Sequence, residues 1–334
     1  MTTLYIVRHA ESEGNLYRRF YGSYDGKLSV NGRKQLDFLR ERFLSIPLDA
    51  VYSSDLTRAY QTALAISEPK GLTVIREPGL REFHLGDWED SSVGEKEELE
   101  AELLREFTVS PATWRVPNSE TFPDVQNRAV AAIKAIAAKH PGQSVAVATH
   151  GMVIRALQAY ILNVDADNIG TVRYVDNTSV TVIDADENGN LTQTLAGDSS
   201  HLPTELSTFA RQTWWKEKNG TDRKNIYFKP IDDGRKAEAI LHGEICGSVT
   251  LDMDNYAADN AAWLVSLSLK PEYRNSGLGV QLIGYGVSYS RRHGRDKLRA
   301  IVSERDNSSV GFFVRHGFER KGEDGGAVKL EYEL

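Results

Sequence analysis

The sequence predicts an α/β protein with two domains. Its 334 residues, 40% of them hydrophobic, are more than one domain usually holds and enough to bury a sizeable core. Two short apolar runs, residues 4–7 and 144–149, have the composition of buried strands, and each ends abruptly at a histidine-containing stretch. In open α/β sheets, ligands bind at the carboxyl ends of the strands. We therefore expect the functional site where these two strands end.

Arg8 and His9 follow the first of these runs. By its chemistry alone, His9 is compatible with a nucleophile, a general base or a metal ligand. The fixed charge of Arg8 would repel a metal ion and attract an anion, which favours a nucleophile that faces a phosphate. An arginine–histidine pair at a strand end is more often two solvated side chains, so this interpretation needs partner residues elsewhere.

The residues after this strand extend the pattern into a motif. Arg8-His9-Ala10-Glu11-Ser12-Glu13-Gly14-Asn15 resembles the Arg-His-Gly-Glu-[Ser/Thr]-x-x-Asn signature of the histidine phosphatase superfamily, with Ala10 in place of glycine. The following loop resembles the family's continuation through Arg19, Gly22, Asp25, Leu28 and Gly32. The resemblance implies a phosphoglycerate-mutase-like three-layer α/β/α domain over residues 1–197. It also implies that His9 is the nucleophile and that Arg8, Asn15 and Arg19 bind phosphate.

A helical pattern covers residues 33–43, and a second strand, residues 50–52, ends shortly before Asp55. We expect Asp55 to cap the next helix, which places Arg58 in its first turn. A helix N-terminus attracts anions, and a guanidinium beside it adds two parallel hydrogen bonds to phosphate oxygens. Residues 53–63 also resemble the second signature of the family, whose arginine touches the phosphate. Arg58 is therefore a candidate phosphate-binding residue.

A short strand at residues 73–75 leads to Glu82. Residues 80–89 resemble the family stretch in which a glutamate donates a proton. Because an alkoxide leaves poorly until it is protonated, Glu82 would protonate the leaving group and then accept a proton from the attacking water. The alternative is a structural carboxylate held in a salt bridge or helix cap.

The acidic segment 95–107 places Leu99, Leu103 and Phe107 at helical spacing. Most such runs are solvated faces, but in relatives this insertion covers the active site, so we interpret it as a lid. Residues 117–121 resemble a Pro-Gly-Gly-Glu-Ser element that precedes the last long helix, here residues 124–139. That resemblance makes Glu120 a candidate substrate contact.

The strand at residues 144–149 ends at His150, which is followed by a helix. Two separate strands thus deliver a histidine at their ends, a repetition that chance does not readily give. In the family the second histidine contacts the transferred phosphoryl group, so Arg8, Arg58 and His150 would surround the group bound at His9. His9 must be unprotonated at the attacking nitrogen, and no metal is required. Residues 179–184 and 191–195 predict a hairpin at the sheet edge.

Residues 198–203 are small and polar and end in proline, which is typical of a linker. We expect a helix over residues 205–218, with Trp214 and Trp215 in packing contacts, and then strands at residues 226–228, 238–241, 247–251 and 262–269. The last strand, with Trp263, Val265, Leu267 and Leu269 on one face, leads into Arg274-Asn275-Ser276-Gly277-Leu278-Gly279 and a helix over residues 280–292. Glycines there let backbone N–H groups surround an anion at a helix N-terminus.

This loop resembles the acetyl-CoA loop of the GNAT N-acetyltransferases, and a strand at residues 300–302 with a helix that begins at Asn307 resembles the end of that family. The resemblance implies a GNAT-like α/β domain with a mostly antiparallel sheet over residues 204–334. Residues 274–279 and Asn307 would bind acetyl-CoA, and an amine would accept the acetyl group. Phe313 stands where the family often places a tyrosine general acid, and Tyr285 and Tyr289 are weak candidates for that role.

Composition limits the other functions. A net charge of −7 argues against a nucleic-acid partner, and no apolar run approaches the ~20 residues that span a bilayer. The N-terminus runs into a strand without a basic leader. A single cysteine, Cys246, excludes intrachain disulfides and multi-cysteine zinc sites, and we expect it in the core. We expect a cytoplasmic protein.

The leading hypothesis is a bifunctional enzyme: a metal-independent phosphatase of a small phosphorylated metabolite, fused to an acetyl-CoA-dependent N-acetyltransferase. A phosphosugar mutase is the rival for the first domain, although mutases of this family carry a longer insertion with extra arginines. A non-catalytic module that senses acyl-CoA is the rival for the second domain, because of Phe313. The fusion also suggests that both domains act on one phosphorylated amine.

Overall fold

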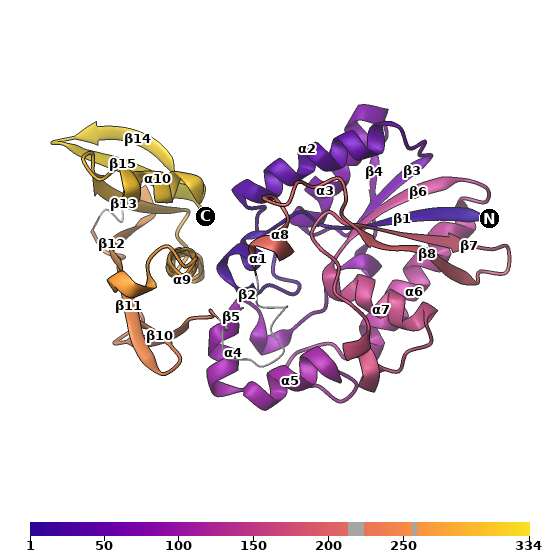
Figure 1. The fold of residues 1–334 in the computed structure, drawn as a ribbon, viewed down its shortest axis with the longest axis horizontal. Helices are drawn as coiled ribbons and strands as arrows, with labels where there is room; N and C mark the ends of the chain where they lie inside the picture. Colours follow the sequence, from indigo (N-terminus) through magenta and orange to yellow (C-terminus); the bar gives the residue numbers. More distant parts are fainter. Residues whose placement is uncertain (213–223, 256–258) are drawn as a thin grey trace. The chain divides into compact units, whose positions relative to one another are not determined.

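The computed structural model describes residues 1–212, 224–255 and 259–334, which belong to two compact units (Figure 1). The first unit contains Met1–Ser12, Phe20–Glu89 and Glu100–Lys216, and the second contains Glu13–Arg19, Asp90–Leu99 and Glu217–Leu334. Each unit has its own sheet. The α/β class is therefore confirmed, whereas the limits 1–197 and 204–334 stay a prediction.

The first unit is built on a six-stranded sheet in the order β4-β3-β6-β1-β7-β8. The two apolar runs singled out in the sequence are β1 and β6, which pair in parallel at the centre. β3 and β4 continue the parallel part, while β7 and β8 form the expected antiparallel hairpin with β8 at the edge. The strands are β1 (Thr2–Arg8), β3 (Ala50–Ser53), β4 (Val74–Arg76), β6 (Ser144–Thr149), β7 (Val180–Ala185) and β8 (Leu191–Asp198), and the short β2 (Arg19–Phe20) and β5 (Ser91–Ser92) pair separately.

Helices cover both faces of this sheet, which gives the predicted three layers (Figure 1). Val7 faces α2 and α3, whereas Leu4 and Ile6 face α6 and α7, because successive side chains of a strand point to opposite faces. The helices of the first 211 residues are α1 (Glu13–Tyr17), α2 (Val30–Leu44), α3 (Thr57–Ser67), α4 (Val93–Leu99), α5 (Ala101–Val109), α6 (Phe122–Lys139), α7 (Gly151–Ile161) and α8 (Thr208–Arg211).

Three local predictions differ from the structure. The acidic segment forms two helices, α4 and α5, because Glu100 leaves the helical conformation and its carboxylate accepts a hydrogen bond from the Trp88 indole; Leu99 is 61% exposed. Asp55 does not cap α3. It forms a bidentate ion pair with Arg81 instead. Of the helix predicted over residues 205–218, residues 205–212 are described, and only α8 within them is helical. Trp214 and Trp215 lie outside the described residues.

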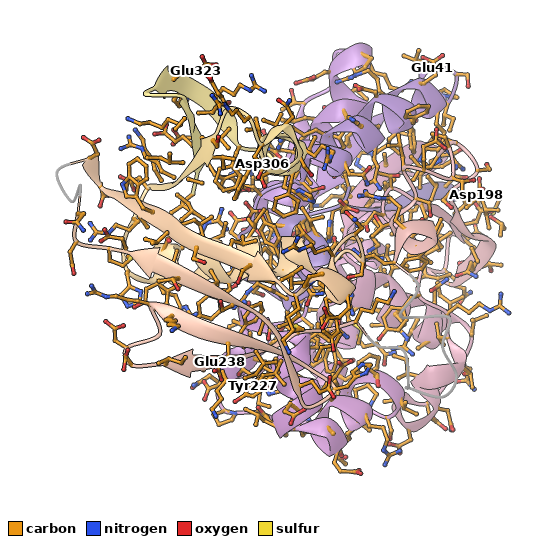
Figure 2. All side chains as sticks on the ribbon, turned by 60° about the vertical axis from the view of Figure 1, so that its left-hand side comes forward. Glu41, Asp198, Tyr227, Glu238, Asp306 and Glu323 are labelled. Atoms are coloured by element: carbon orange, nitrogen blue, oxygen red, sulfur yellow. The ribbon has the colours of Figure 1, made fainter. Side chains whose placement is uncertain are left out.

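The second unit contains a seven-stranded sheet in the order β14-β15-β13-β12-β11-β10-β9. β12 and β13 pair in parallel and the other neighbours pair antiparallel, which confirms a mostly antiparallel sheet. Figure 2 labels Tyr227 on β9, at one edge, and Glu238 on the neighbouring β10. The elements are β9 (Tyr227–Ile231), β10 (Lys236–Leu241), β11 (Glu244–Asp252), β12 (Ala261–Leu269), α9 (Gly279–Arg292), β13 (Lys297–Ser303), α10 (Asn307–Arg315), β14 (Glu319–Asp324) and β15 (Ala327–Glu333).

Candidate active site

Three neighbouring parallel strands of the first unit end at the same edge. His9 follows β1, Ser54 follows β3 and His150 follows β6. The ring centroids of His9 and His150 lie 5.1 Å apart, and both rings are buried. The sheet therefore brings together the two histidines that the sequence places 141 positions apart (150 − 9).

His9 is held as a neutral imidazole with one free lone pair. Its Nδ1 lies 2.7 Å from the Ala10 carbonyl oxygen. A carbonyl oxygen only accepts, so Nδ1 carries the proton and Nε2 carries the lone pair. Burial lowers the pKa of His9 well below 6.5, and the charges of Arg58 and Arg8 lower that pKa further. The ring is therefore unprotonated at Nε2, as a nitrogen nucleophile must be.

Ala10 fits the backbone at the position where the family signature has glycine. Its N–H donates to Thr62 Oγ1 at 3.0 Å, and its side chain is fully buried. The carbonyl of His9 accepts from Asn177 Nδ2 at 2.8 Å. These two hydrogen bonds fix the peptide group that joins His9 to Ala10.

Two guanidiniums supply the positive charge, the buried Arg58 and the part-buried Arg8. Arg58, the second residue of α3, donates to the carbonyls of Tyr24 and Gly22 at 2.8 and 2.5 Å. Arg8 donates from Nη1 to the Val175 carbonyl at 2.5 Å. Burial lowers the pKa of both arginines, and the Glu82 carboxylate opposes that shift in both. Both nevertheless stay charged, because guanidinium pKa values lie far above neutrality.

Two buried nitrogen atoms of this site have no hydrogen-bond partner among the described residues: Arg8 Nε and His150 Nδ1. The other nitrogen of His150, Nε2, lies 2.8 Å from Ser54 Oγ. Arg8 Nε faces the start of α7, since a Cβ added at Gly151 would come within 3.4 Å of it. Buried polar atoms are almost always paired in folded proteins, so these two point to a polar ligand.

The Glu82 carboxylate is held against the start of α7. One oxygen accepts from the Phe83 N–H at 2.9 Å, and the other accepts from the Met152 N–H at 3.2 Å. Arg128 on α6 donates to the Glu82 carbonyl at 3.0 Å and to both oxygens of Glu120. Glu82 is thus positioned from both sides, and its charge acts on both Arg8 and Arg58.

The structure does not assign a role in this site to three other predicted residues, Arg19, Asn15 and Glu120. Arg19 is nearly buried and pairs with Asp90 at 2.8 Å, so the structure gives it a structural ion pair. Asn15 lies on α1, in the second unit, and its contact with phosphate stays a prediction. Glu120 pairs with Arg128; burial alone would raise its pKa, but the hydrogen bonds from Arg128 and the His84 N–H lower it overall.

Three further residues support the site and were not predicted from the sequence: Ser54, Arg128 and Asn177. Ser54 follows a strand of the same parallel set as the two histidines, and that position was the available signal. Arg128 and Asn177 act on backbone carbonyls, and no motif marks such contacts in a sequence.

In the second unit, the predicted acetyl-CoA loop connects β12 to α9. β12 pairs with β13 from Ala261–Lys297 to Leu264–Ala300, and β12 then continues to Leu269. Gly277 has a φ of +82°, a conformation that favours glycine, and α9 begins at Gly279. The first turn of a helix has N–H groups without partners inside the helix. The loop is built as predicted, while its binding of acetyl-CoA stays a prediction.

The residues considered for the general-acid role in this unit make other contacts. Phe313 on α10 is buried against Phe318, with ring centroids 4.9 Å apart. Tyr285 donates to the Gly234 carbonyl at 2.6 Å, and burial raises the pKa of Tyr285 to about 12. Tyr289 donates to the Asp233 carbonyl at 3.2 Å. These hydroxyls lie at the turn between β9 and β10, which does not support the acid role suggested for them.

The described residues contain no group of three or more histidine, cysteine, aspartate or glutamate side chains arranged to hold a metal ion. Cys246 is buried in the core, as predicted. Among the helices that the structure describes, none is both long and apolar enough to cross a bilayer.

Comparison with known proteins defines the class. Residues 4–197 match the model of the histidine phosphatase superfamily (branch 1), so the chain belongs to that superfamily, and residues 204–318 match the acetyltransferase (GNAT) family. Phosphoserine phosphatase 1 of Hydrogenobacter thermophilus is 35% identical over 191 residues, which are 57% of this chain and 90% of the relative. Phosphoglycerate mutase-like protein 4 of Arabidopsis thaliana is 33% identical over 200 residues, 59% of this chain and 85% of the relative. Among solved structures, Bacillus stearothermophilus YhfR aligns with a TM-score of 0.58 and 34% identity over 60% of this chain and 99% of its own.

Proposed function

We propose that the first unit hydrolyses phosphomonoesters through a phosphohistidine at His9. The observation that carries this proposal is the neutral ring of His9, with its Nε2 lone pair free, beside the guanidiniums of Arg58 and Arg8 and the ring of His150. The unpartnered Arg8 Nε and His150 Nδ1 support an anionic ligand in the same place. Such preorganised cations stabilise the charge of a phosphoryl group in transfer.

The reaction has two steps. His9 Nε2 attacks the phosphorus, the bond to the ester oxygen breaks, and the Glu82 carboxylic acid gives its proton to the leaving alkoxide. A water molecule then attacks the phosphorus while the Glu82 carboxylate takes its proton, and the N–P bond breaks. Inorganic phosphate leaves, and His9 and Glu82 return to their starting states. The cations of Arg8 and Arg58 take the place that a metal ion has in other phosphoryl transferases.

The experiment is a phosphomonoester screen on the wild type and on His9→Ala, with phosphate release as the readout. We expect the wild type to release phosphate and to form an acid-labile, alkali-stable phosphoprotein from a radiolabelled substrate. His9→Ala should do neither. A matched control is His84→Ala, since His84 is half exposed and lies outside the ring pair. Activity in His9→Ala would contradict the proposal.

We include a phosphorylated amine as the substrate class. The fusion to an acetyltransferase-like domain supports this choice, and so does the phosphoserine phosphatase of H. thermophilus among the relatives. The panel should therefore pair phosphoserine with amine-free esters of similar size, such as phosphoglycolate and 3-phosphoglycerate. A best substrate without an amine would overturn this part.

A mutase is the second candidate for this site, because a mutase-like protein of A. thaliana is also similar to this chain. Separating the products decides between the two. A phosphatase releases inorganic phosphate and leaves a dephosphorylated alcohol, whereas a mutase returns an isomer that still carries phosphate. We expect only the first outcome.

We propose that the second unit transfers the acetyl group of acetyl-CoA to an amine, using residues 274–279 and Asn307 to bind the coenzyme. The loop conformation at Gly277, the helix start at Gly279 and the position of Asn307 as the first residue of α10 support this. The rival, a module that only senses acyl-CoA, is favoured by Phe313, which cannot donate a proton. Calorimetry with coenzyme A and an acetylation assay on an amine panel separate them, since binding without transfer supports the sensor.

A further inference from the structure

Residues 204–211, called the junction segment below, belong to the first compact unit although they fall within the acetyltransferase family match. They also lie beyond the phosphatase match, which ends at residue 197. β8 ends at Asp198, labelled in Figure 2, and the chain reaches the junction segment after a turn at residues 199–202. The segment then contacts the residues that flank His9.

One set of contacts fixes Asp176. The Ser207 hydroxyl donates to one carboxylate oxygen at 2.6 Å. The N–H groups of Asn177 and Phe209 donate to the other oxygen at 2.8 and 3.3 Å. Asp176 is 6% exposed, so these donors replace water around a buried carboxylate.

A second set of contacts fixes Glu11, two residues after His9. The Glu11 carboxylate, 1% exposed, accepts from Thr208 Oγ1 at 3.1 Å and lies 3.6 Å from Arg211 Nη1. Gln35 joins both sides, since it donates to the Leu206 carbonyl at 2.7 Å and accepts from the Glu11 N–H at 2.8 Å. The junction segment therefore contacts Asp176 and also Glu11, two residues after His9.

The charge of Asp176 opposes the lowering of the Arg8 pKa by burial, and Arg8 donates to the carbonyl of the residue before Asp176, Val175. A buried carboxylate beside an arginine ordinarily forms a bidentate ion pair with it. Among the described residues no such ion pair joins these two, and Arg8 Nε keeps no partner. The guanidinium instead lies 5.8 Å from the centroid of the Phe209 ring. The Ser207 hydroxyl and the Phe209 N–H donate to the two oxygens of Asp176 instead.

We propose that the junction segment is part of the phosphatase site: Ser207 and Phe209 hold Asp176 away from Arg8, so that the guanidinium stays available to the phosphoryl group. This inference rests on the proposed function of the first unit. Ser207, Asp176 and Phe209 are positioning residues, since they act on the phosphate through Arg8. The histidine phosphatase match at residues 4–197 thus omits a segment that the site needs.

The test uses the full chain and four variants: Ser207→Ala, Ser207→Thr, Asp176→Asn and the double variant Asp176→Asn with Ser207→Ala. The readouts are KM and kcat for the best phosphomonoester and the Kd of inorganic phosphate from calorimetry. In Ser207→Ala the freed carboxylate turns to Arg8 and competes with phosphate. We expect KM and the phosphate Kd to rise about ten-fold, with kcat changed less than about three-fold. Ser207→Thr keeps the hydroxyl and should stay near the wild type.

The double variant separates this role from a general loss of packing. Once Asp176 is an amide, it no longer competes with phosphate for Arg8, so removal of the Ser207 hydroxyl should have no further effect on phosphate affinity. Ser200→Ala is the matched control, because Ser200 is exposed in the turn before the segment. Unchanged phosphate affinity in Ser207→Ala would overturn the inference. So would an equal loss of phosphate affinity on removal of the Ser207 hydroxyl from the wild type and from Asp176→Asn. If the wild type hydrolyses esters normally, such a result leaves the proposed function standing; a wild type that binds no phosphate removes both.

Discussion

At the scale of single residues, the site depends on an imidazole kept uncharged among cations. His9 and His150 both have pKa values well below 6.5, because burial removes the water that would stabilise the imidazolium and because Arg58 adds repulsion. The same burial strengthens the attraction of both guanidiniums for an anion. One environment therefore keeps a lone pair of His9 available and favours an anion beside it.

The first prediction concerns pH. Since the folded pKa of His9 is lowered, the ring stays neutral as the pH falls through 6.5, and we expect kcat/KM to stay level there and to decline only at lower pH. In the unfolded chain the histidines take up protons near 6.5, so acid also lowers the free energy of unfolding over the window below that value. Initial rates from brief assays separate the two effects. An acid limb centred at or above pH 6.5 would contradict the assigned environment.

The second prediction concerns Glu82. Glu82→Gln removes the proton donor but keeps the shape of the side chain. We expect kcat for alkyl phosphates to fall about 100- to 10,000-fold. Phosphorylation of His9 by an aryl phosphate with an acidic phenol should be much less affected, because that leaving group needs no proton. Asp87→Asn serves as the control, since the Asp87 carboxylate accepts an exposed hydrogen bond from Asn118. Equal losses for both substrate types would refute the donor role.

The residues that carry charge or a lone pair at the strand ends could be predicted from the sequence: His9, Arg8, Arg58, Glu82 and His150 all lie in the site described. Residues that act through hydrogen bonds to carbonyls or to other carboxylates could not. Asp176 has no motif around it, and its role depends on Ser207, which lies 31 positions away. A hydrogen bond between such distant residues depends on the tertiary fold, and no periodic pattern in the sequence indicates it.

At the scale of elements, the start of α3 shows how a local rule fails in a tertiary setting. Aspartate is a common N-cap residue and Asp55 lies just before the helix, but its carboxylate forms a bidentate ion pair with Arg81 instead. Asp25, from an earlier loop, caps the helix in its place. Its carboxylate accepts hydrogen bonds from the Thr57 N–H at 2.7 Å and from the Thr57 hydroxyl at 2.8 Å. The helix that presents Arg58 is thus anchored from a different segment.

The third prediction follows from this anchor. Asp25→Ala leaves the Thr57 N–H at the start of α3 without its acceptor, and we expect it to lower the free energy of unfolding by about 1 kcal/mol. We also expect a weaker affinity for inorganic phosphate, because Arg58 is the second residue of this helix. Asp55→Ala, which removes an exposed ion pair, should alter phosphate affinity less. Denaturant unfolding and phosphate calorimetry check both variants.

Strand and helix positions were predicted well where the apolar pattern is local and continuous, as in β6, which spans the expected residues 144–149. These positions were predicted poorly where contacts with a neighbouring element determine the local structure. The simple alternation expected for β12 fails at Val265, which is 64% exposed, since the register with β11 shifts next to Leu251. The acidic segment is likewise divided at Glu100 by the indole of Trp88.

At the scale of the whole molecule, each unit has its own sheet and its own core. We therefore expect that a substitution can abolish the proposed activity of one unit and leave that of the other unchanged. Gly277 has a φ of +82° in the predicted coenzyme loop. A β-branched side chain there costs about 1–3 kcal/mol of backbone strain.

The fourth prediction is therefore that Gly277→Val weakens coenzyme A binding at least about ten-fold while phosphatase kcat/KM stays at the wild-type level. His9→Ala should show the reverse pattern. Calorimetry with coenzyme A and phosphate-release assays on both variants test the separation. Loss of both activities in either variant would show that the units do not work independently.

The position of β1 also limits when the enzyme can form during its synthesis. Its two neighbours in the sheet are β6 and β7, so the strand that carries the nucleophile has no partner until residues 144–149 and 180–185 have been made. Contacts between distant parts of a chain close slowly, and an unpaired apolar strand is prone to aggregate. The chain must therefore be synthesised to residue 149 of 334 before its first seven strand-forming residues can pair with β6, and to residue 185 before they can pair with β7. We expect the nascent chain to expose this apolar strand until then.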